Sequence, residues 1–325
     1  MPRRHMEKAK EVLQIESRVI ADLTDRIDEN FHRAVETILR ISGKVIVLGM
    51  GKSGLVGRKL SATFSSTGTP SFFMHPGEAA HGDLGGISER DLIMLISNSG
   101  ETGELIQLLP NLKRKNVPII GMFGNVNSTL AEGCDVVLNT GVKKEACPLG
   151  IVPTASSIAS SAMGDALAIS LLDKRGFEEK DFAEFHPGGS LGKRLLTTVD
   201  DLMHKGDRIP LISKDKEMKD VIVVMTQKGL GVTGALDENE NLVGVITDGD
   251  LRRGIERSTE FVYAKAESLM SLNPKWITKD RLAIDALKIM EKFSITSLFV
   301  FDEENKGKPV GVIHIHDILK YGIMT

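Results

Sequence analysis

Short apolar runs alternate with longer segments of mixed polarity between residues 45 and 174 of this sequence. The alternation predicts an α/β fold, a doubly wound parallel sheet with helices on both faces. Ligands bind such sheets at the carboxyl ends of the strands. The apolar runs are rich in β-branched and aromatic residues and predict buried strands at 45–48, 71–74, 92–97, 117–123 and 136–139. Helix-compatible segments follow some of these runs, notably at 55–66, 104–115 and 156–174.

Two amphipathic helices are predicted before the first strand, at 6–26 and 28–41, because apolar residues recur there at helical spacing. Ile20, Leu23 and Ile27 provide more apolar surface than one contact layer needs. We therefore expect these helices to cover the sheet and also to pair with another subunit, which makes the chain a homo-oligomer.

The second half of the chain contains an internal repeat that follows a boundary region at 197–207. Leu202 recurs as Leu269, and the segment Val243-Gly-Val-Ile246 recurs as Val310-Gly-Val-Ile313. Each copy has the pattern of a small α+β unit, and neither copy has enough apolar residues to bury a core alone. We therefore expect the two copies to pack as a pair. The predicted domains are 1–196, 197–263 and 264–325.

Composition excludes several classes of protein. The 325 residues carry a net charge of −3, which gives no general attraction to nucleic acid or to an anionic membrane. No apolar run approaches the ~18 residues that span a bilayer, and no signal-peptide pattern precedes the first helix. The two cysteines, Cys134 and Cys147, lack the spacing of a zinc site or a disulfide framework. We expect a cytoplasmic protein.

A glycine-rich turn follows the first predicted strand, in the segment Gly49-Met-Gly-Lys52-Ser53-Gly54. Backbone amides at the start of the next helix favour an anion there, most often a phosphate. A P-loop would need glycine at position 46, where the chain has Ile46, so a nucleoside triphosphatase is disfavoured. The glycine spacing also fits a dinucleotide turn, and the alternative to any ligand is a tight turn that binds nothing. Lys52 and Ser53 favour a phosphate.

A second turn of similar character follows the strand at 92–97. Hydroxyls and glycines cluster in it, with Ser97, Ser99 and Thr102 before a predicted helix. Hydroxyls combined with helix N-terminal amides suit a phosphate monoester. Serine and threonine are also favoured as ordinary N-caps. Two such turns after two strands of one sheet favour the phosphate site.

The repeat resembles a tandem pair of CBS (cystathionine β-synthase) domains through the segment Gly244-Val-Ile-Thr247-x-x-Asp250. In that family the threonine and aspartate hold the ribose of an adenosine-type ligand. The resemblance therefore implies an adenine nucleotide or a nucleotide sugar at Thr247 and Asp250, in either a regulatory or a purely structural module. The second copy departs from the motif, because His314 replaces the hydroxyl residue before Asp317.

The first ~200 residues resemble the SIS (sugar isomerase) domain, of a size expected for one domain, and are similar to D-arabinose-5-phosphate isomerases. Together with the CBS pair, the resemblance covers nearly the whole chain. The matching segments, besides the two turns above, are Thr67-Gly-Thr-Pro-Ser-Phe-Phe73, His75-Pro-Gly-Glu-Ala-Ala-His81-Gly-Asp83, Lys144-Glu-Ala-Cys-Pro-Leu-Gly150, Pro153-Thr-Ala-Ser-Ser157, Met163-Gly-Asp-Ala-Leu-Ala168 and His186-Pro-Gly-Gly-Ser-Leu-Gly192.

The resemblance implies interconversion of D-arabinose 5-phosphate and D-ribulose 5-phosphate through an enediol, without a redox cofactor. This reaction feeds synthesis of the octulosonate sugar (3-deoxy-D-manno-octulosonate) of lipopolysaccharide or capsule. The alternatives are a non-catalytic phosphosugar sensor that signals through the CBS pair and an isomerase for another phosphosugar, since specificity depends on the shape of the pocket. The resemblance also implies a tetramer in which some catalytic residues come from a neighbouring subunit.

The resemblance assigns the proton-transfer chemistry to Lys52, Glu104, Glu145 and His186. Lys52 contacts the phosphate or stabilises the enediolate, and Glu104 or Glu145 is the carbon-acid base, which would need a raised pKa. His186 opens the furanose ring, since an imidazole exchanges protons near pH 7. The expected substrate-binding residues are Ser53, Gly68, Thr69, His81, Ser97, Ser99 and Thr102.

Each catalytic candidate also has a simpler interpretation. Glu104 is compatible with a first-turn acid that interacts with the helix dipole, and Glu145 with a surface charge beside Lys143 and Lys144. His186 precedes proline and is compatible with a helix end. Together, the four residues favour an enzyme, because a sensor needs no proton-transfer groups.

His75 and His81, with Glu78 and Asp83 nearby, have the donor types that bind a transition metal. The predicted chemistry does not need a metal. The resemblance implies that zinc inhibits such enzymes, and we expect His75 to be the zinc ligand.

Overall fold

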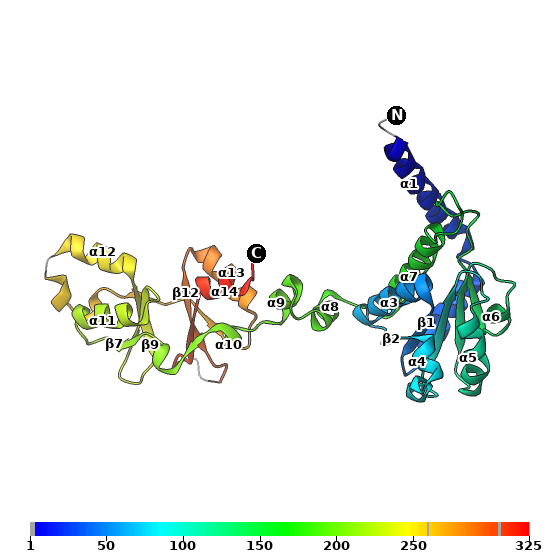
Figure 1. The fold of residues 1–325 in the computed structure, drawn as a ribbon. Coiled ribbons are helices and arrows are strands. Elements are labelled where there is room, and N and C mark those ends of the chain that lie inside the picture. The colour runs from blue at the N-terminus through cyan, green and yellow to red at the C-terminus, as the bar shows by residue number, and fades with distance from the viewer. Residues whose placement is uncertain (1–3, 259, 305–306, 325) are drawn as a thin grey trace. The chain divides into compact units, whose positions relative to one another are not determined.

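The computed structural model describes residues 4–258, 260–304 and 307–324 (Figure 1). The chain forms two units, Met1–Phe182 and Ala183–Thr325, each with its own hydrophobic cores. The helix α8 (Glu179–Phe185) crosses the division.

Five parallel strands form the sheet of the first unit, in the order β2-β1-β3-β4-β5. The predicted parallel sheet is therefore confirmed. The fourth strand begins two residues later than expected, because Pro118 has no amide hydrogen to donate to a neighbouring strand. The strands are β1 (Val45–Gly49), β2 (Ser71–Met74), β3 (Leu92–Ser97), β4 (Ile119–Phe123) and β5 (Val136–Asn139).

Helices cover both faces of this sheet, and the side chains of β1 show how. Val45 and Val47 point into one core, whereas Ile46 and Leu48 point into the other. Figure 1 shows α3 and α7 on one side of the strands and α5 and α6 on the other. The first core is covered by α2 (Glu29–Arg40), α3 (Gly51–Ser66) and α7 (Ala155–Lys174), and the second by α4 (Pro76–Ala80), α5 (Gly103–Arg114) and α6 (Thr129–Glu132).

The long first helix, α1 (Arg4–Leu23), is followed by the short turn η1 (Thr24–Arg26). Ile15 and Leu23 of α1 are buried, so the helix does cover part of the unit, as expected. Leu13, Ile20 and Ile27 are exposed in the single chain. Ile20 and Ile27 are therefore part of the surplus apolar surface from which the sequence predicts an oligomer, whereas Leu23, named with them, is buried in the core of the unit, and Leu13 is a further exposed residue.

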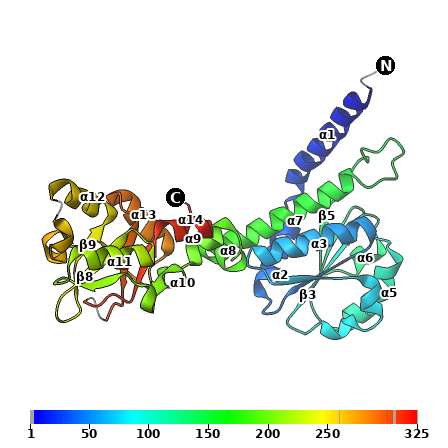
Figure 2. The same ribbon diagram turned by 60° about the vertical axis from the view of Figure 1, so that its left-hand side comes forward.

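The α7 helix is the one described helix with the length and composition to cross a membrane, and half of its most apolar window is buried in the fold. Met163, Leu167 and Leu171 of this helix belong to the sheet's first core. Figure 2 shows α7 running beside α3 along the sheet. The helix is therefore a core helix of the first unit.

The second unit contains the two repeats, which exchange short strands. The strand β6 (His204–Lys205), before the first repeat's main strands, pairs with β13 (Gly311–His314) of the second repeat. The strand β10 (Ser271–Leu272) pairs in turn with β9 (Leu242–Thr247) of the first repeat. Val232 also packs with Phe299 in a core shared by both repeats. The expectation that the repeats pack as a pair is confirmed.

The remaining elements of the second unit follow in chain order. Up to residue 258 these are α9 (Ser190–Leu196), α10 (Val199–Leu202), η3 (Gly206–Arg208), β7 (Leu211–Ser213), α11 (Met218–Lys228), β8 (Val232–Leu236), β9 (Leu242–Thr247) and α12 (Asp248–Arg257). From residue 260 onward they are η4 (Phe261–Tyr263), η5 (Ala266–Ser268), β11 (Trp276–Thr278), α13 (Ala283–Phe293), β12 (Ser297–Phe301), β13 (Gly311–His314) and α14 (Ile315–Tyr321).

Candidate functional site

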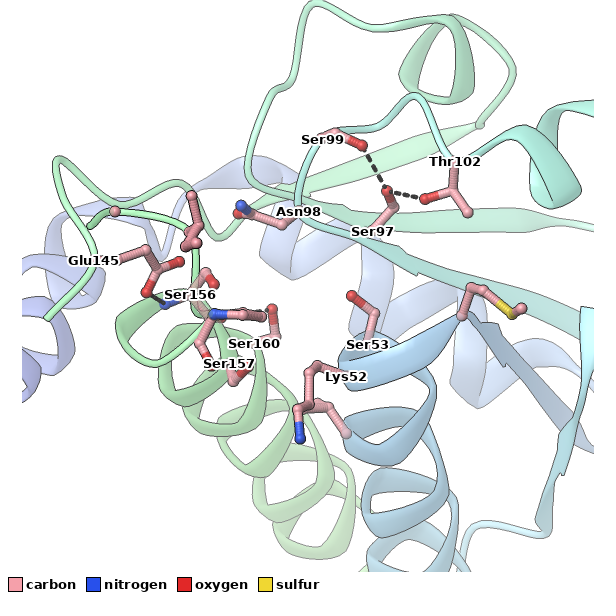
Figure 3. A pocket seen from close by; sticks show the side chains of 15 residues that line it. Lys52, Ser53, Ser97, Asn98, Ser99, Thr102, Glu145, Ser156, Ser157 and Ser160 are labelled. Carbon is pink, nitrogen blue, oxygen red and sulfur yellow. Dashed lines mark hydrogen bonds between the residues drawn. The ribbon is translucent and has the colours of Figure 1, made fainter. Parts of the chain in front are cut away.

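A cavity of about 350 Å³ lies in the first unit, at the carboxyl edge of the sheet. Three segments form it: the turn from β1 into α3, the loop from β3 into α5, and the start of α7 with the loop before it (Figure 3). Hydroxyl side chains are the most frequent type in its walls. The lining residues are Met50, Lys52, Ser53, Val56, Ser97, Asn98, Ser99, Thr102, Glu145, Gly150, Ile151, Pro153, Ser156, Ser157 and Ser160.

The turn from β1 into α3 is tight because its glycines leave no room for side chains. A Cβ at Gly54 would lie 2.6 Å from the carbonyl oxygen of Gly49, and Gly51 has φ of +57°. The structure shows no side chain among the described residues capping α3, so its first amides remain free for a ligand. Figure 3 shows the Ser53 hydroxyl directed toward Ser97, whereas the Lys52 side chain extends the other way along the cavity.

The loop from β3 into α5 holds a cluster of hydroxyls at the end of the strand. The Ser97 Oγ lies 2.8 Å from the Thr102 Oγ1 and accepts a hydrogen bond from the Gly100 amide at 3.0 Å. The Ser99 Oγ lies 3.5 Å from the Ser97 Oγ. Thr102 is the N-cap residue of α5, but its hydroxyl bonds to Ser97 rather than to a described amide of its own helix. The Leu105 amide donates to the Thr102 carbonyl at 3.1 Å, so the first two amides of α5, those of Gly103 and Glu104, are the ones available to an anion.

The Glu145 carboxylate lies at the start of α7 and takes the place of its N-cap side chain. Its Oε2 accepts hydrogen bonds from the Thr154 amide at 2.8 Å, the Thr154 hydroxyl at 3.0 Å and the Ser156 amide at 3.3 Å. Burial by itself would raise the pKa of Glu145, but the polar groups of Ser156 and Thr154 outweigh it and hold the pKa below its ordinary value. The raised pKa that the sequence argument asks of a carbon-acid base is therefore absent from Glu145 in this chain as described.

The predicted phosphate-binding residues Ser53, Ser97, Ser99 and Thr102 all line this one cavity, together with Lys52 and Glu145. The structure thus brings together residues from three distant parts of the sequence. Sequence reasoning did not single out other lining residues, namely Asn98, Ser156, Ser157 and Ser160. The Ser156 Oγ is buried and has no hydrogen-bond partner in the described part of the chain.

Glu104 and His186 lie elsewhere. Glu104 is in the first turn of α5 with an exposed side chain, outside the cavity wall. His186 belongs to the second unit, in the turn between α8 and α9, and is half-buried. The cavity of the first unit therefore contains two of the four expected catalytic residues.

Gly68 and Thr69 lie at the wrong edge of the sheet for this cavity. They precede β2, whereas the cavity is at the carboxyl ends of β1 and β3. Gly68 has φ of +85° and packs beside Phe177, and Thr69 is only 1% exposed. In this unit the two residues form the turn between α3 and β2 rather than a wall of the cavity.

His75 and His81 flank α4, after the carboxyl end of β2. The Nδ1 of His75 accepts a hydrogen bond from the Gly77 amide at 3.1 Å, so this nitrogen caps the helix. His81 is exposed at the other end of α4. Across residues 4–258, 260–304 and 307–324, no three His, Cys, Asp or Glu side chains are grouped to hold a metal ion.

In the second unit, Thr247 and Asp250 bond to each other. The Asp250 Oδ2 accepts from the Thr247 hydroxyl at 2.7 Å and from the Thr247 amide at 2.8 Å, while its Oδ1 accepts from Arg253 at 2.7 Å. Burial would raise the pKa of Asp250, but Thr247 and Arg253 lower it below its usual range. Thr247 also lines a cavity of about 370 Å³ between the repeats, together with Lys275 and Phe299.

The corresponding position of the second repeat is occupied differently. The Nε2 of His204 lies 2.8 Å from the Oδ2 of Asp317, and the Nδ1 of His314 accepts from the His316 amide at 3.1 Å. Burial, with His316 and His204 nearby, holds the pKa of His314 below its ordinary value. Asp317 therefore bonds to a strand of the first repeat rather than to the residue three positions before it.

Comparison with known families divides the chain into three matched regions. Residues 38–170 match the SIS domain family, and residues 199–257 and 266–323 each match the CBS domain family.

Similar proteins match over almost the whole chain. The arabinose 5-phosphate isomerase KdsD of Yersinia pestis is 47% identical over 97% of this chain and 95% of its own length. The protein of the same name from Escherichia coli K12 gives the same values. A solved structure of the Escherichia coli CFT073 protein c3406, in complex with arabinose 5-phosphate, is 39% identical, with a TM-score of 0.56 over 57% of this chain and 100% of that chain.

Proposed function

The chain belongs to the arabinose 5-phosphate isomerase family, and from this premise we propose that it interconverts D-arabinose 5-phosphate and D-ribulose 5-phosphate through an enediol intermediate. One observation on the residues of this chain supports the proposal. Two free helix N-termini and a hydroxyl cluster meet in one cavity that also contains an ammonium group and a carboxylate.

The phosphate of the substrate binds between α3 and α5. Backbone amides at the two helix starts, and the hydroxyls of Ser53, Ser97 and Thr102, supply donors to its three non-bridging oxygens. Because Ser97 and Thr102 already bond to each other, their hydroxyls are held in place before the ligand arrives. The buried Ser156 hydroxyl is a further polar group on the facing wall of the cavity.

The chemistry moves a proton between C2 and C1 and needs charge stabilisation on oxygen. Lys52 supplies a positive charge at the cavity for the phosphate or the enediolate. Glu145 is ionised at neutral pH, since its pKa is lowered, and it either accepts the carbon proton or orders the loop before α7. Glu104 is the second candidate for the carbon base, and His186 opens the sugar ring.

We propose that Glu104 and His186 complete the site in a homo-oligomer, a tetramer. Apolar side chains at two places support association. Leu13 and Ile20 are exposed on α1, and Leu149 and Ile151 are 77% and 74% exposed on the loop that borders the cavity. A contact there would bring a second subunit next to the substrate. His81 then orients substrate hydroxyls from the α4 region.

The remaining roles follow from the family. We propose that the product enters synthesis of 3-deoxy-D-manno-octulosonate for lipopolysaccharide or capsule, and that the enzyme works in the cytoplasm. The cavity at Thr247 binds an adenine nucleotide or a nucleotide sugar, with apolar walls for the base and Lys275 near the phosphates. Asp250 joins this site only if the ligand displaces its bonds to Thr247 or Arg253.

Isomerisation through an enediol requires no cofactor. We keep zinc as an inhibitor that binds His75, although the described residues around it do not form a ligand set. Zinc titration of the wild type and of His75→Ala tests this role. Equal inhibition of both proteins would exclude His75.

The isomerase assay is run with arabinose 5-phosphate in deuterated water, with detection of ketose and of deuterium at the exchanged carbon. We expect turnover with label incorporation. Glu145→Gln and His186→Asn should each lower kcat by about 10²-fold or more if they transfer a proton. Glu132→Gln, an exposed acid on α6, is the matched control and should leave kcat unchanged. Tight binding without turnover or exchange would instead support a phosphosugar sensor.

A further inference from the structure

The turn that carries His186 is packed tightly against α9. A Cβ at Gly192 would lie 2.2 Å from the His186 carbonyl oxygen and 2.9 Å from the Pro187 Cα, so only glycine fits there. The amide of Gly189 donates to the same carbonyl at 3.0 Å. The backbone of His186 is therefore set by the position of α9.

The residue after Gly192 connects α9 to the last helix of the chain. The Lys193 Nζ donates to the Tyr321 carbonyl at 3.0 Å and lies 5.1 Å from the centre of the Tyr321 ring. Carbonyls in the last turn of a helix lack intrahelical partners and carry partial negative charge, so an ammonium group there is favoured. The aromatic ring adds a cation–π attraction. Lys193 thus caps the carboxyl end of α14.

The other end of α9 is attached to the same repeat. The Thr197 carbonyl accepts from the Ala283 amide at 2.9 Å, and the Val199 amide donates to the Arg281 carbonyl at 2.8 Å. After α14 the chain is anchored by Ile323, which is buried in the core of the second repeat. The helix α9 is therefore held to the second repeat at two places, by backbone bonds just after its carboxyl end and by the Lys193 side chain in its middle.

We propose that Lys193 is a positioning residue for His186, through which the second CBS repeat holds the imidazole that opens the sugar ring. The connection runs from α14 through Lys193 and Gly192 to the backbone of His186. The proposal rests on the proposed isomerase function and on the role of His186 in it. It assigns the second repeat a part in the reaction that requires no ligand between the repeats.

The test compares three variants of the full-length protein. Lys193→Met keeps a long side chain but removes the charge and the donor, whereas Lys193→Arg keeps both. Lys219→Met is the matched control, because Lys219 likewise lies near an aromatic ring, 5.9 Å from that of Tyr263, and pairs with Glu217 within the first repeat. We expect Lys193→Met to lower kcat on the order of 10-fold with KM within about twofold, since small displacements of a reacting group lower the rate steeply. Lys193→Arg should restore most of kcat.

A second set of variants carries His186→Asn. If Lys193 acts through His186, Lys193→Met should produce no further loss of kcat in that background. An equal loss in both backgrounds would overturn the proposal, as would an unchanged kcat in Lys193→Met alone. A wild-type rate for His186→Asn would also overturn it, while leaving the isomerase function intact. Absence of turnover in the wild type would overturn the isomerase function itself.

Structural damage is separated from loss of positioning by fluorescence of Trp276, the only tryptophan of the chain, which lies in the second unit. Assays are run where this signal shows the second unit of every variant to be folded. A loss of kcat that Lys219→Met reproduces would show a general effect of removing a lysine, and would contradict a specific role for Lys193.

Discussion

Hydroxyl residues at a helix start occur in both units, but with opposite outcomes. In the second unit, the Thr247 hydroxyl and the Asp250 carboxylate satisfy each other and the start of α12. In the first unit, the Ser97 and Thr102 hydroxyls bond to each other, and no described side chain caps α3 or α5. The difference is whether the protein itself supplies the acceptor for the helix amides. An uncapped start beside a cavity leaves helix amides available to a ligand, whereas a capped start has them satisfied within the fold.

The start of α7 lies between these two cases. Glu145 caps it from nine residues upstream of Thr154 and also lines the cavity. The same carboxylate therefore both stabilises the start of α7 and lies within reach of a ligand in the cavity. A ligand that competes for the Thr154 and Ser156 amides would release it, which links the loop before α7 to occupancy of the cavity.

The largest expected effect comes from placing a carboxylate at the uncapped start of α3. Ser53→Asp places a negative charge where the phosphate binds, and two such charges 4 Å apart repel by about 4 kcal/mol at an effective dielectric constant near 20. We expect kcat/KM to fall about 10³-fold, while the carboxylate at the start of α3 leaves thermal stability equal or higher. Steady-state kinetics and thermal unfolding measure the two effects.

Ser53→Ala is the control for that change. It removes one hydrogen bond to a charged ligand, so kcat/KM should fall by only about 10- to 100-fold. Equal losses in the two variants would show that the hydroxyl, rather than an open anion site, is what matters at this position.

The complementary change removes the capping interaction between Thr247 and Asp250 at the start of α12, in the second unit. Asp250→Ala removes an N-cap partner of α12, and we expect the free energy of unfolding of the second unit to fall by about 1–2 kcal/mol. Urea unfolding followed by Trp276 fluorescence reports this unit alone, because the chain has one tryptophan. Asp248→Ala, an exposed acid in the same turn, should lower it by only about 0.3–1 kcal/mol. A smaller loss of unfolding free energy for Asp250→Ala than for Asp248→Ala would contradict the role of Asp250 in capping α12.

The cap that Glu145 provides for α7 predicts that the stability of the fold depends on pH. The folded-state pKa of Glu145 is lowered, so its ionised form stabilises the fold above the unfolded-state pKa of about 4.3, and this stabilisation is lost as pH falls through the folded-state pKa. The stability difference between wild type and Glu145→Gln should therefore shrink as the pH is lowered from about 6 toward 3. Urea unfolding by circular dichroism measures it, and a difference independent of pH would exclude the ionised cap.

The smallest effect concerns the two cysteines, which differ in how amides surround the sulfur. Amides of residues 149–152, with Val152 first, lower the pKa of Cys147, whereas burial raises the pKa of Cys134 to about 12. Cys147 should be alkylated by iodoacetamide much faster than Cys134 at pH 7.5, because the thiolate is the reactive form. Peptide mass spectrometry over time distinguishes them, and comparable rates would contradict this order.

The sequence predicted the sheet and most of one wall of the cavity because these depend on local patterns. Apolar runs located the strands, and the glycine and hydroxyl turns after β1 and β3 located Lys52, Ser53, Ser97, Ser99 and Thr102. Strand direction also carries information that the motif comparison overlooked. Gly68 and Thr69 precede β2, so a parallel sheet places them at the edge away from the cavity.

The facing wall was harder to predict, because it depends on how α7 packs. Ser156, Ser157 and Ser160 lie more than fifty residues after Thr102. Ser156 and Ser157 belong to one of the segments that resemble the family, but nothing in that segment says that they face the two turns. The position of Glu145 depends on hydrogen bonds to residues that are distant from it in sequence, at the other end of the loop before α7. No periodicity in the sequence reports such a bond, which is why its lowered pKa was not expected.

A crystal structure of the protein with arabinose 5-phosphate bound tests the central claim most directly. The account predicts the phosphate between the starts of α3 and α5, within hydrogen-bond distance of the Ser53, Ser97 and Thr102 hydroxyls. A phosphate bound outside this cavity, for example at Lys143 and Lys144, would contradict it.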